Sequence, residues 1–164
     1  MTGIDSPEQG NALDAFSTLG DFLKDDGWYP QQLDGKQIYR MGFGGHNGQM
    51  TCYAQVWDDL EQFAFYVLAP VKAPEALRPA AAEFITRANY GLRIGNFELD
   101  YLDGELRYKS SLDFEGVALT LELINNAIYP AVQTMDRYIP GLMEVIYGDR
   151  SPAEAVAAIE NETG

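Results

Sequence analysis

The sequence predicts an α+β fold in which an antiparallel sheet packs against helices. Apolar residues recur at every second position between residues 28 and 69, which is the period of half-buried strands. They recur every three or four positions in residues 10–26, 73–90 and 120–147, which is typical of amphipathic helices. Two further alternating runs flank a turn signal at residues 103–104 and predict a hairpin. Because strands and helices do not alternate one for one, a parallel nucleotide-binding sheet is disfavoured.

Length and composition indicate one globular domain. The chain has 164 residues, of which 46% are hydrophobic, and this supplies enough apolar material for a sizeable core. We expect a flexible N-terminus over residues 1–9, a single domain over residues 10–160 and a tail over residues 161–164.

The charge balance narrows the classes of partner. The chain has 11 Lys and Arg residues against 25 Asp and Glu residues, a formal charge of −14, and contains no basic run. Such a field repels phosphate backbones and anionic lipid surfaces, so we expect no nucleic-acid and no membrane partner. The longest apolar run, residues 63–71, is far shorter than the roughly 18 residues of a membrane span. No export signal is visible at the start, and we therefore expect a cytoplasmic protein.

The first helix is predicted to begin near residue 10 and to end before Gly27, which suits the position after a helix C-terminus. Two starts compete, because Ser6 and Pro7 resemble a capping box and Asn11 caps a shorter helix. The apolar stripe of this helix consists of Leu13, Phe16, Leu19, Phe22 and Leu23.

A meander of about four strands is expected over residues 28–69. A two-residue turn at Asp34–Gly35 pairs Pro30 with Tyr39. Pro30 has no N–H for a ladder, so the first strand should lie at an edge of the sheet. Residues 63–69 are apolar on both faces, so this strand should be central or covered.

Residues 73–90 predict a second helix that ends before Gly91. Pro79 conflicts with this helix, because proline lacks an amide N–H and crowds the carbonyl four residues back. The helix therefore either starts near Arg78 or bends there.

The hairpin after the second helix is predicted to turn at Asp103–Gly104. That turn gives one apolar face and one face of opposite charges. The predicted pairs are Tyr101–Leu106 and Leu99–Tyr108 on the apolar face, and Asp100–Arg107 and Glu98–Lys109 on the charged face.

Two more helices are predicted after the hairpin. Thr120 can cap a long helix that runs toward Tyr147, and Pro130 and Pro140 should kink or divide it. Ser151–Pro152 then starts a short C-terminal helix.

No catalytic or metal-binding constellation stands out, and we predict no cofactor. His46 lies in a glycine-rich loop, where it is either part of a hairpin turn or a base in a mobile site. Cys52 is the only cysteine, so an intramolecular disulfide is excluded and a cysteine-based metal site is disfavoured. The pattern favours a turn at His46.

The chain carries more apolar residues than one sheet face requires. Either the core is larger than the pattern assigns, or the surplus marks a homodimer or a groove for a partner. On the second interpretation we predict partner-binding residues at Phe16, Phe22, Phe63 and Phe65, and a dimer surface at Leu77, Phe84 and Ile85.

Residues 87–116, RANYGLRIGNFELDYLDGELRYKSSLDFEG, resemble the YbjN family of bacterial proteins, and we expect a cyanobacterial member. The resemblance extends over about residues 10–160 and implies a fold similar to class I type III secretion chaperones, often found as dimers. Family members are described as sensory transduction regulators, and the family offers no catalytic residue to carry over. The motif residues to which we assign structural roles are Asn89, Gly91, Gly95, Asn96, Phe97, Asp100, Asp103 and Gly104.

The functional hypothesis is therefore a non-enzymatic, chaperone-like adaptor or regulator. We expect it to be a homodimer that binds an amphipathic segment of a partner protein. The alternative is a small-ligand sensor or an acid/base enzyme that uses the His46 loop.

Overall fold

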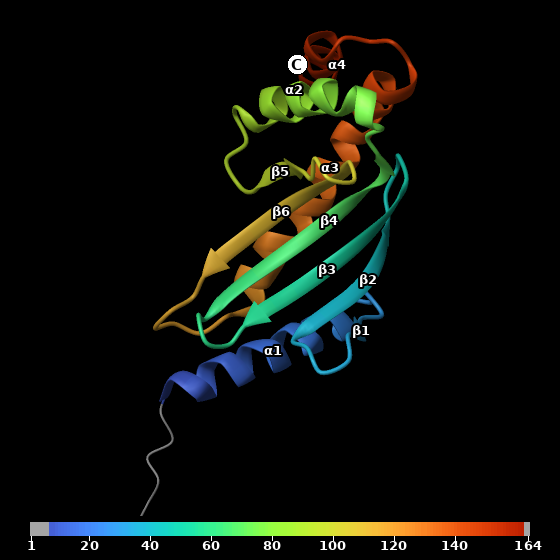
Figure 1. Cartoon of the computed structure of the whole chain (residues 1–164). Helices are drawn as coiled ribbons and strands as arrows, with labels where there is room; N and C mark the ends of the chain where they lie inside the picture. The colour runs from blue at the N-terminus through green and yellow to red at the C-terminus, as the bar shows by residue number, and fades with distance from the viewer. Residues whose placement is uncertain (1–6, 163–164) are drawn as a thin grey trace, which may run out of the picture.

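The computed structural model describes residues 7–162, with side chains from residue 15 onward. In this part of the chain, helices pack against a six-stranded antiparallel sheet with the order β1-β2-β3-β4-β6-β5 (Figure 1). The helices are α1 (Pro7–Asp25), α2 (Arg78–Asn89, after a 3₁₀ turn at Glu75–Leu77), α3 (Leu121–Tyr147) and α4 (Pro152–Asn161). The strands are β1 (Gln31–Gln32), β2 (Ile38–Gly44), β3 (Gln49–Trp57), β4 (Gln62–Lys72), β5 (Asn96–Leu99) and β6 (Glu105–Asp113). The predicted α+β class and the four-strand meander are confirmed.

One face of the sheet is covered and the other is not. α3 runs behind the sheet in Figure 1, while α2 and α4 lie together at one end. Side chains along β3 alternate strictly between buried and partly exposed, as expected for a sheet with one solvated face. As predicted, β4 is central and the first strand lies at an edge, although Pro30, on which the edge prediction rested, precedes β1.

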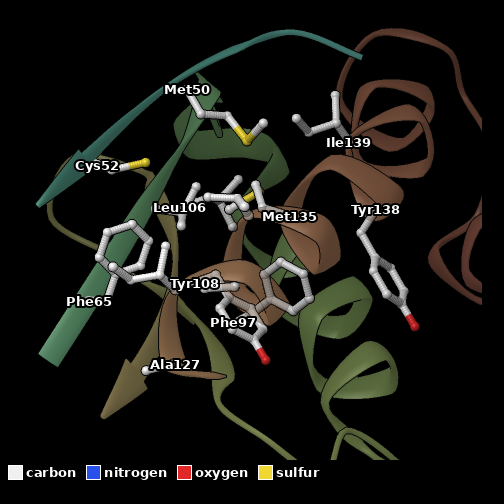
Figure 2. Close-up of a cluster of buried hydrophobic side chains, with 14 of the residues drawn as sticks. Met50, Cys52, Phe65, Phe97, Leu106, Tyr108, Ala127, Met135, Tyr138 and Ile139 are labelled. Carbon is white, nitrogen blue, oxygen red and sulfur yellow. The ribbon is translucent and has the colours of Figure 1, made fainter. Parts of the chain in front are cut away.

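The core lies between the covered face and α3. Figure 2 shows Cys52, Phe65 and Tyr108 from three neighbouring strands beside Met135 of α3, and each of these residues is at most 1% exposed. No described helix is long and apolar enough to cross a membrane.

The predicted starts of the last two helices are confirmed. Thr120 Oγ1 accepts a hydrogen bond from the Leu123 N–H at 3.2 Å, and Ser151 Oγ accepts from the Glu154 N–H at 3.2 Å. α3 continues as one helix of 27 residues through Pro130 and Pro140, so these prolines do not divide it.

Two helix boundaries were left open by the sequence. α1 begins at Pro7, so the expected start near residue 10 is wrong, and the competing cap Ser6 lies outside the described residues. α2 begins at Arg78, with Pro79 in its first turn. This is the first of the two alternatives, and the proline is tolerated because N–H groups of the first turn have no partner within the helix.

The register of the first hairpin is two residues away from the prediction. Gln32, not Pro30, lies opposite Tyr39. The Leu33 N–H donates to the Ile38 carbonyl at 2.9 Å, which makes the loop longer than two residues. Tyr29 has a positive φ of 53°, and this interrupts the strand that was expected to include Pro30.

The register of the second hairpin differs by the same amount. Leu99 lies opposite Leu106, and Glu98 lies opposite Arg107, so the predicted pairs are wrong by two residues. The turn is longer because Asp100 accepts from the Leu102 N–H at 2.9 Å and Asp103 accepts from the Glu105 N–H at 3.0 Å. Since a shift of two preserves the alternation, the apolar and charged faces remain as predicted.

Candidate partner-binding site

A group of aromatic side chains lies where α1 ends and the chain enters the sheet. We call Phe16, Phe22, Trp28, Tyr29 and Phe43 the α1 patch. Phe16 stacks on Tyr39 with ring centroids 4.6 Å apart, and Trp28 stacks on Phe43 at 5.4 Å. Phe16, Phe22 and Phe43 are partly exposed, and Tyr29 is 89% exposed. The patch is therefore fixed on the core yet open to solvent.

Asp26 fixes the patch to α3. The indole N–H of Trp28 donates to Asp26 Oδ2 at 3.0 Å, and the hydroxyl of Tyr129 donates to the same oxygen. The hydrogen bond to Asp26, together with burial, raises the pKa of Tyr129 above its usual value. The phenol therefore keeps its proton and remains a donor at neutral pH.

Beside the patch, half of β2 has an unpaired edge. β1 pairs only with Tyr39 and Arg40, and no other described strand continues along the outer edge of β2. The Ile38 carbonyl accepts a hydrogen bond from the Leu33 N–H, on the side of β2 away from β3. In an antiparallel strand every second residue directs its N–H and C=O to the same side, so the even-numbered residues of β2 face the outer edge. By this parity the N–H and C=O groups of Gly42 and Gly44 point to the open edge. An edge of this kind can accept a strand from another chain.

The structure places the four predicted partner-binding residues in two different environments. Phe16 and Phe22 belong to the α1 patch. Phe63 and Phe65 are both 0% exposed, because they lie on the covered face of the central strand β4. For these two residues the prediction of a surface groove is wrong, since a side chain in the core offers no surface to a partner.

The residues predicted for a dimer surface also point inward. Phe84 is 1% exposed and packs edge to face on Tyr138 at 6.2 Å, and Ile85 is 8% exposed. Leu77 is partly buried against the core. The outward face of α2 instead carries Tyr90 at its end, 91% exposed beside a hollow of about 470 Å³ between α2 and α4.

The His46 loop is a hairpin turn that α3 holds in place. Asp136 accepts hydrogen bonds from the N–H of His46 at 3.2 Å and of Asn47 at 2.9 Å, and the Asn47 side chain donates to the Asp136 carbonyl at 2.9 Å. A Cβ at Gly45 would collide with the Asp136 carboxylate, which explains that glycine. His46 and Asp136 are 90 residues apart, so no local pattern could have predicted this anchor.

Cys52 lies in the core, and the described acidic residues form no metal-binding cluster. Cys52 is 0% exposed, and burial raises the pKa of its thiol to about 12. It therefore stays protonated at neutral pH and is a poor nucleophile. Within residues 7–162, no group of three or more His, Cys, Asp and Glu side chains is placed to hold a metal ion.

The motif residues of the second hairpin pack tightly. Gly95 has a φ of 72°, and a Cβ there would meet the Lys109 carbonyl oxygen. Phe97 packs edge to face on Tyr108 at 5.0 Å and on Tyr138 at 5.4 Å. Gly91, directly after the α2 cap, has a φ of 124°.

The order of elements and the one-sided sheet define a secretion-chaperone-like α+β fold. A chain of the ExsC–ExsE complex matches with a TM-score of 0.57 at 14% identity, covering 79% of this chain and 93% of that one. A chain of the HopA1–SchA complex, described as a chaperone-effector complex, matches with a TM-score of 0.51 at 15% identity, covering 78% of this chain and 96% of that one.

The family follows from the sequence itself. The family model YbjN, described as "Putative bacterial sensory transduction regulator", matches residues 16–144, and the chain belongs to this family. The solved structure of YbjN from E. coli agrees, with a TM-score of 0.56 at 18% identity over 90% of this chain and 92% of that one. None of the curated proteins matches the sequence.

Proposed function

We propose that this chain is a protein-binding adaptor that holds an amphipathic segment of a partner protein. The segment lies along the α1 patch, and its backbone pairs with the open half of β2. The single observation that carries the proposal is the unpaired edge at Gly42 and Gly44 beside the partly exposed aromatic rings of the α1 patch. Backbone pairing supplies affinity and the rings select apolar side chains of the bound segment.

The similar structures support this proposal. Both the ExsC–ExsE and the HopA1–SchA structures are complexes of two different proteins. A role in secretion is not implied by this similarity, because one fold serves many roles. We also propose a cytoplasmic location, since the only cysteine, Cys52, is a buried free thiol.

A matched pair of variants at Gly42 tests the pairing. A Cβ at Gly42 meets only the Met50 carbonyl oxygen at 3.9 Å, so neither substitution is blocked at Cβ. Gly42→Pro removes an N–H that points to the open edge and leaves the ladder to β3 intact, whereas Gly42→Val keeps that N–H.

The measurement is affinity capture of the tagged chain from its native extract, with crosslinking and mass spectrometry. We expect one dominant partner that wild type and Gly42→Val retain and that Gly42→Pro and Phe22→Asp lose. Equal capture by Gly42→Pro would overturn the pairing at β2. Recovery of the chain alone would overturn the adaptor function.

We also infer that the chain is a homodimer. The outward face of α2 with the exposed Tyr90 supports this interface, in place of the buried residues predicted from the sequence. Light scattering at micromolar concentrations should give twice the mass of the 18.2 kDa chain. A dimer that Tyr90→Asp converts to a monomer supports the interface, and a monomeric wild type contradicts it.

The alternative of a ligand sensor at His46 receives no support from the geometry. Asp136 already engages the backbone N–H groups of His46 and Asn47 that would otherwise be available to an anion. These hydrogen bonds to Asp136 are sufficient to explain the conformation of the His46 loop.

A further inference from the structure

The face of the sheet opposite α3 carries a second candidate surface. In Figure 1, no helix crosses in front of β3, β4 and β6 on this face. It lies on the other side of the sheet from the core, so it is distinct from the α1 patch.

A row of four side chains crosses this face. The register places Arg40 opposite Tyr53, Tyr53 opposite Tyr66, and Tyr66 opposite Lys109 on four neighbouring strands. Since strands lie about 4.8 Å apart, the row is about 14 Å long. We call these four residues the tyrosine row. Two rings with a cation at each end form an amphipathic strip.

The positive charge of the row is only partly cancelled by neighbouring carboxylates. Glu98 accepts from Arg107 at 2.9 Å and from Lys109 at 3.2 Å, so one carboxylate serves two cations. The guanidinium of Arg107 also lies 4.3 Å from the Tyr66 ring centroid. Arg40 is exposed and has no salt bridge with any described residue. Together with Arg107 and Glu98, the row sets three cations against one carboxylate.

A hollow of about 380 Å³ lies beside the row. Ala64 lines the hollow and is only 2% exposed. Because the alanine side chain is smaller than those of its neighbours, it leaves space at this position. The residues that line the hollow include Trp57, Tyr66, Lys109, Ser111 and Asp113. An apolar side chain of moderate size fits beside Trp57 and Tyr66.

We propose that the tyrosine row docks an acidic segment of a partner protein. Carboxylates of the segment lie beside Arg40 at one end and beside the Arg107–Lys109 pair at the other. One aromatic or aliphatic side chain between them enters the hollow. Partly desolvated cations on aromatic faces favour carboxylate ligands. Complementary charge then sets the orientation of the bound segment along the row.

Two other occupants fit less well. A second copy packed face to face, about a twofold axis along the strands, would place Arg40 against Lys109. An axis along the row would place each of these cations against its own copy, and like charges in such contact are costly. A nucleic acid would use the tyrosines for stacking, but the charge of −14 repels a polyanion along the rest of the surface.

The test uses a defined peptide rather than a natural partner. The probe is a fluorescein-labelled 12-residue peptide that repeats Glu-Glu-Trp-Glu, and a Lys-for-Glu peptide is its counterpart. Anisotropy titrations compare wild type with Arg40→Glu and Tyr66→Leu. The matched control is Lys36→Glu, which makes the same charge change in the exposed turn before β2. Circular dichroism confirms that each variant is folded.

We expect saturable binding of the acidic peptide that weakens with salt, at least a tenfold loss in Arg40→Glu and Tyr66→Leu, and less than a twofold change in Lys36→Glu. Any attraction of the Lys peptide to the acidic chain should be unchanged in Tyr66→Leu. Equal losses in Arg40→Glu and Lys36→Glu, or no saturable binding, overturn the proposal. Tighter binding of single-stranded DNA that Arg40→Glu abolishes assigns the row to nucleic acid instead. Gly42→Pro should leave peptide binding unchanged, which separates this surface from the one at β2.

Discussion

The side-chain amide of Asn89 forms two hydrogen bonds with the backbone of Phe97. The Phe97 N–H donates to Asn89 Oδ1 at 2.7 Å, and Asn89 Nδ2 donates to the Phe97 carbonyl at 3.1 Å. Phe97 is an interior residue of the edge strand β5, so the end of α2 closes this edge of the sheet. The β2 edge beyond Arg40 has no such cap in the described chain, and this asymmetry directs strand pairing to one side.

Asn89→Ala should destabilise the fold and expose the outer edge of β5. We expect a loss of about 1–3 kcal/mol in the free energy of unfolding, because both backbone groups of Phe97 lose a partner. Urea unfolding measures this loss. Light scattering should also show concentration-dependent association through the freed edge.

Asn96→Ala is the matched control for this change. Asn96 Nδ2 donates only to the Phe97 carbonyl, at 3.2 Å, so its loss leaves the Phe97 N–H satisfied. A variant that behaves like Asn89→Ala would contradict the closing role of Asn89.

Two glycines with positive φ should respond very differently to alanine. Gly104 has a φ of 81°, and a Cβ there would collide with the Ala73 carbonyl, while Gly35 has a φ of 66° with open space around it. Gly35→Ala should lower the free energy of unfolding by about 1 kcal/mol, because only the positive φ is unfavourable for alanine. Gly104→Ala should cost about 3 kcal/mol or more, because Ala73 must also move. Thermal denaturation compares the two, and equal losses would contradict the close approach.

Asp136→Ala should loosen the His46 hairpin. We expect a loss of about 2 kcal/mol in the free energy of unfolding, since two N–H groups lose a charged acceptor. Hydrogen exchange at the amides of His46 and Asn47 should quicken in the same variant. His46→Ala should change stability by less than about 0.5 kcal/mol, because the imidazole is exposed. A large effect of His46→Ala would indicate a role for the ring that the geometry does not show.

Asp103 should make stability depend on pH in the acid range. The Glu105 N–H and, second, the Lys72 ammonium donate to this carboxylate and lower its pKa below the ordinary value. A lowered pKa in the folded state means that the stabilisation is complete above the ordinary carboxyl pKa of about 3.9. It is lost as the pH falls through the folded value.

Urea midpoints of wild type and Asp103→Asn at several pH values measure this effect. The difference between them should be constant near neutral pH and shrink below about pH 4. An NMR titration gives the pKa directly, and a value at or above 3.9 for Asp103 would refute the expected direction.

Alternation along the strands was sufficient to predict which residues face the core. The sequence correctly assigned Leu106 and Tyr108 to one face and Arg107 and Lys109 to the other. It failed on the pairing by two residues, because loop length depends on contacts that are not periodic. At the second hairpin those contacts are the turns at Asp100 and Asp103 and the contact of Gly104 with Ala73.

The candidate site could be predicted only in part, for a similar reason. An aromatic residue on a periodic stripe is equally suited to a core and to a surface groove. Phe16 and Phe22 proved to be partly exposed, whereas Phe63 and Phe65 are buried because they lie on the face of the central strand β4 that α3 covers. The position of a strand in the sheet is a property of the assembled fold.

The sequence by itself determined the α+β class, the helix caps at Thr120 and Ser151, the edge position of the first strand and the family. The two caps follow from local rules, in which a residue acts on neighbours a few positions away, whereas the family follows from a match along most of the chain. Only the tertiary structure decided which sheet edge is closed by Asn89, which hairpin is held by Asp136 and which aromatic rings reach the surface. Such contacts depend on how the elements assemble, from Asn89 and Phe97, eight residues apart, to His46 and Asp136, 90 residues apart.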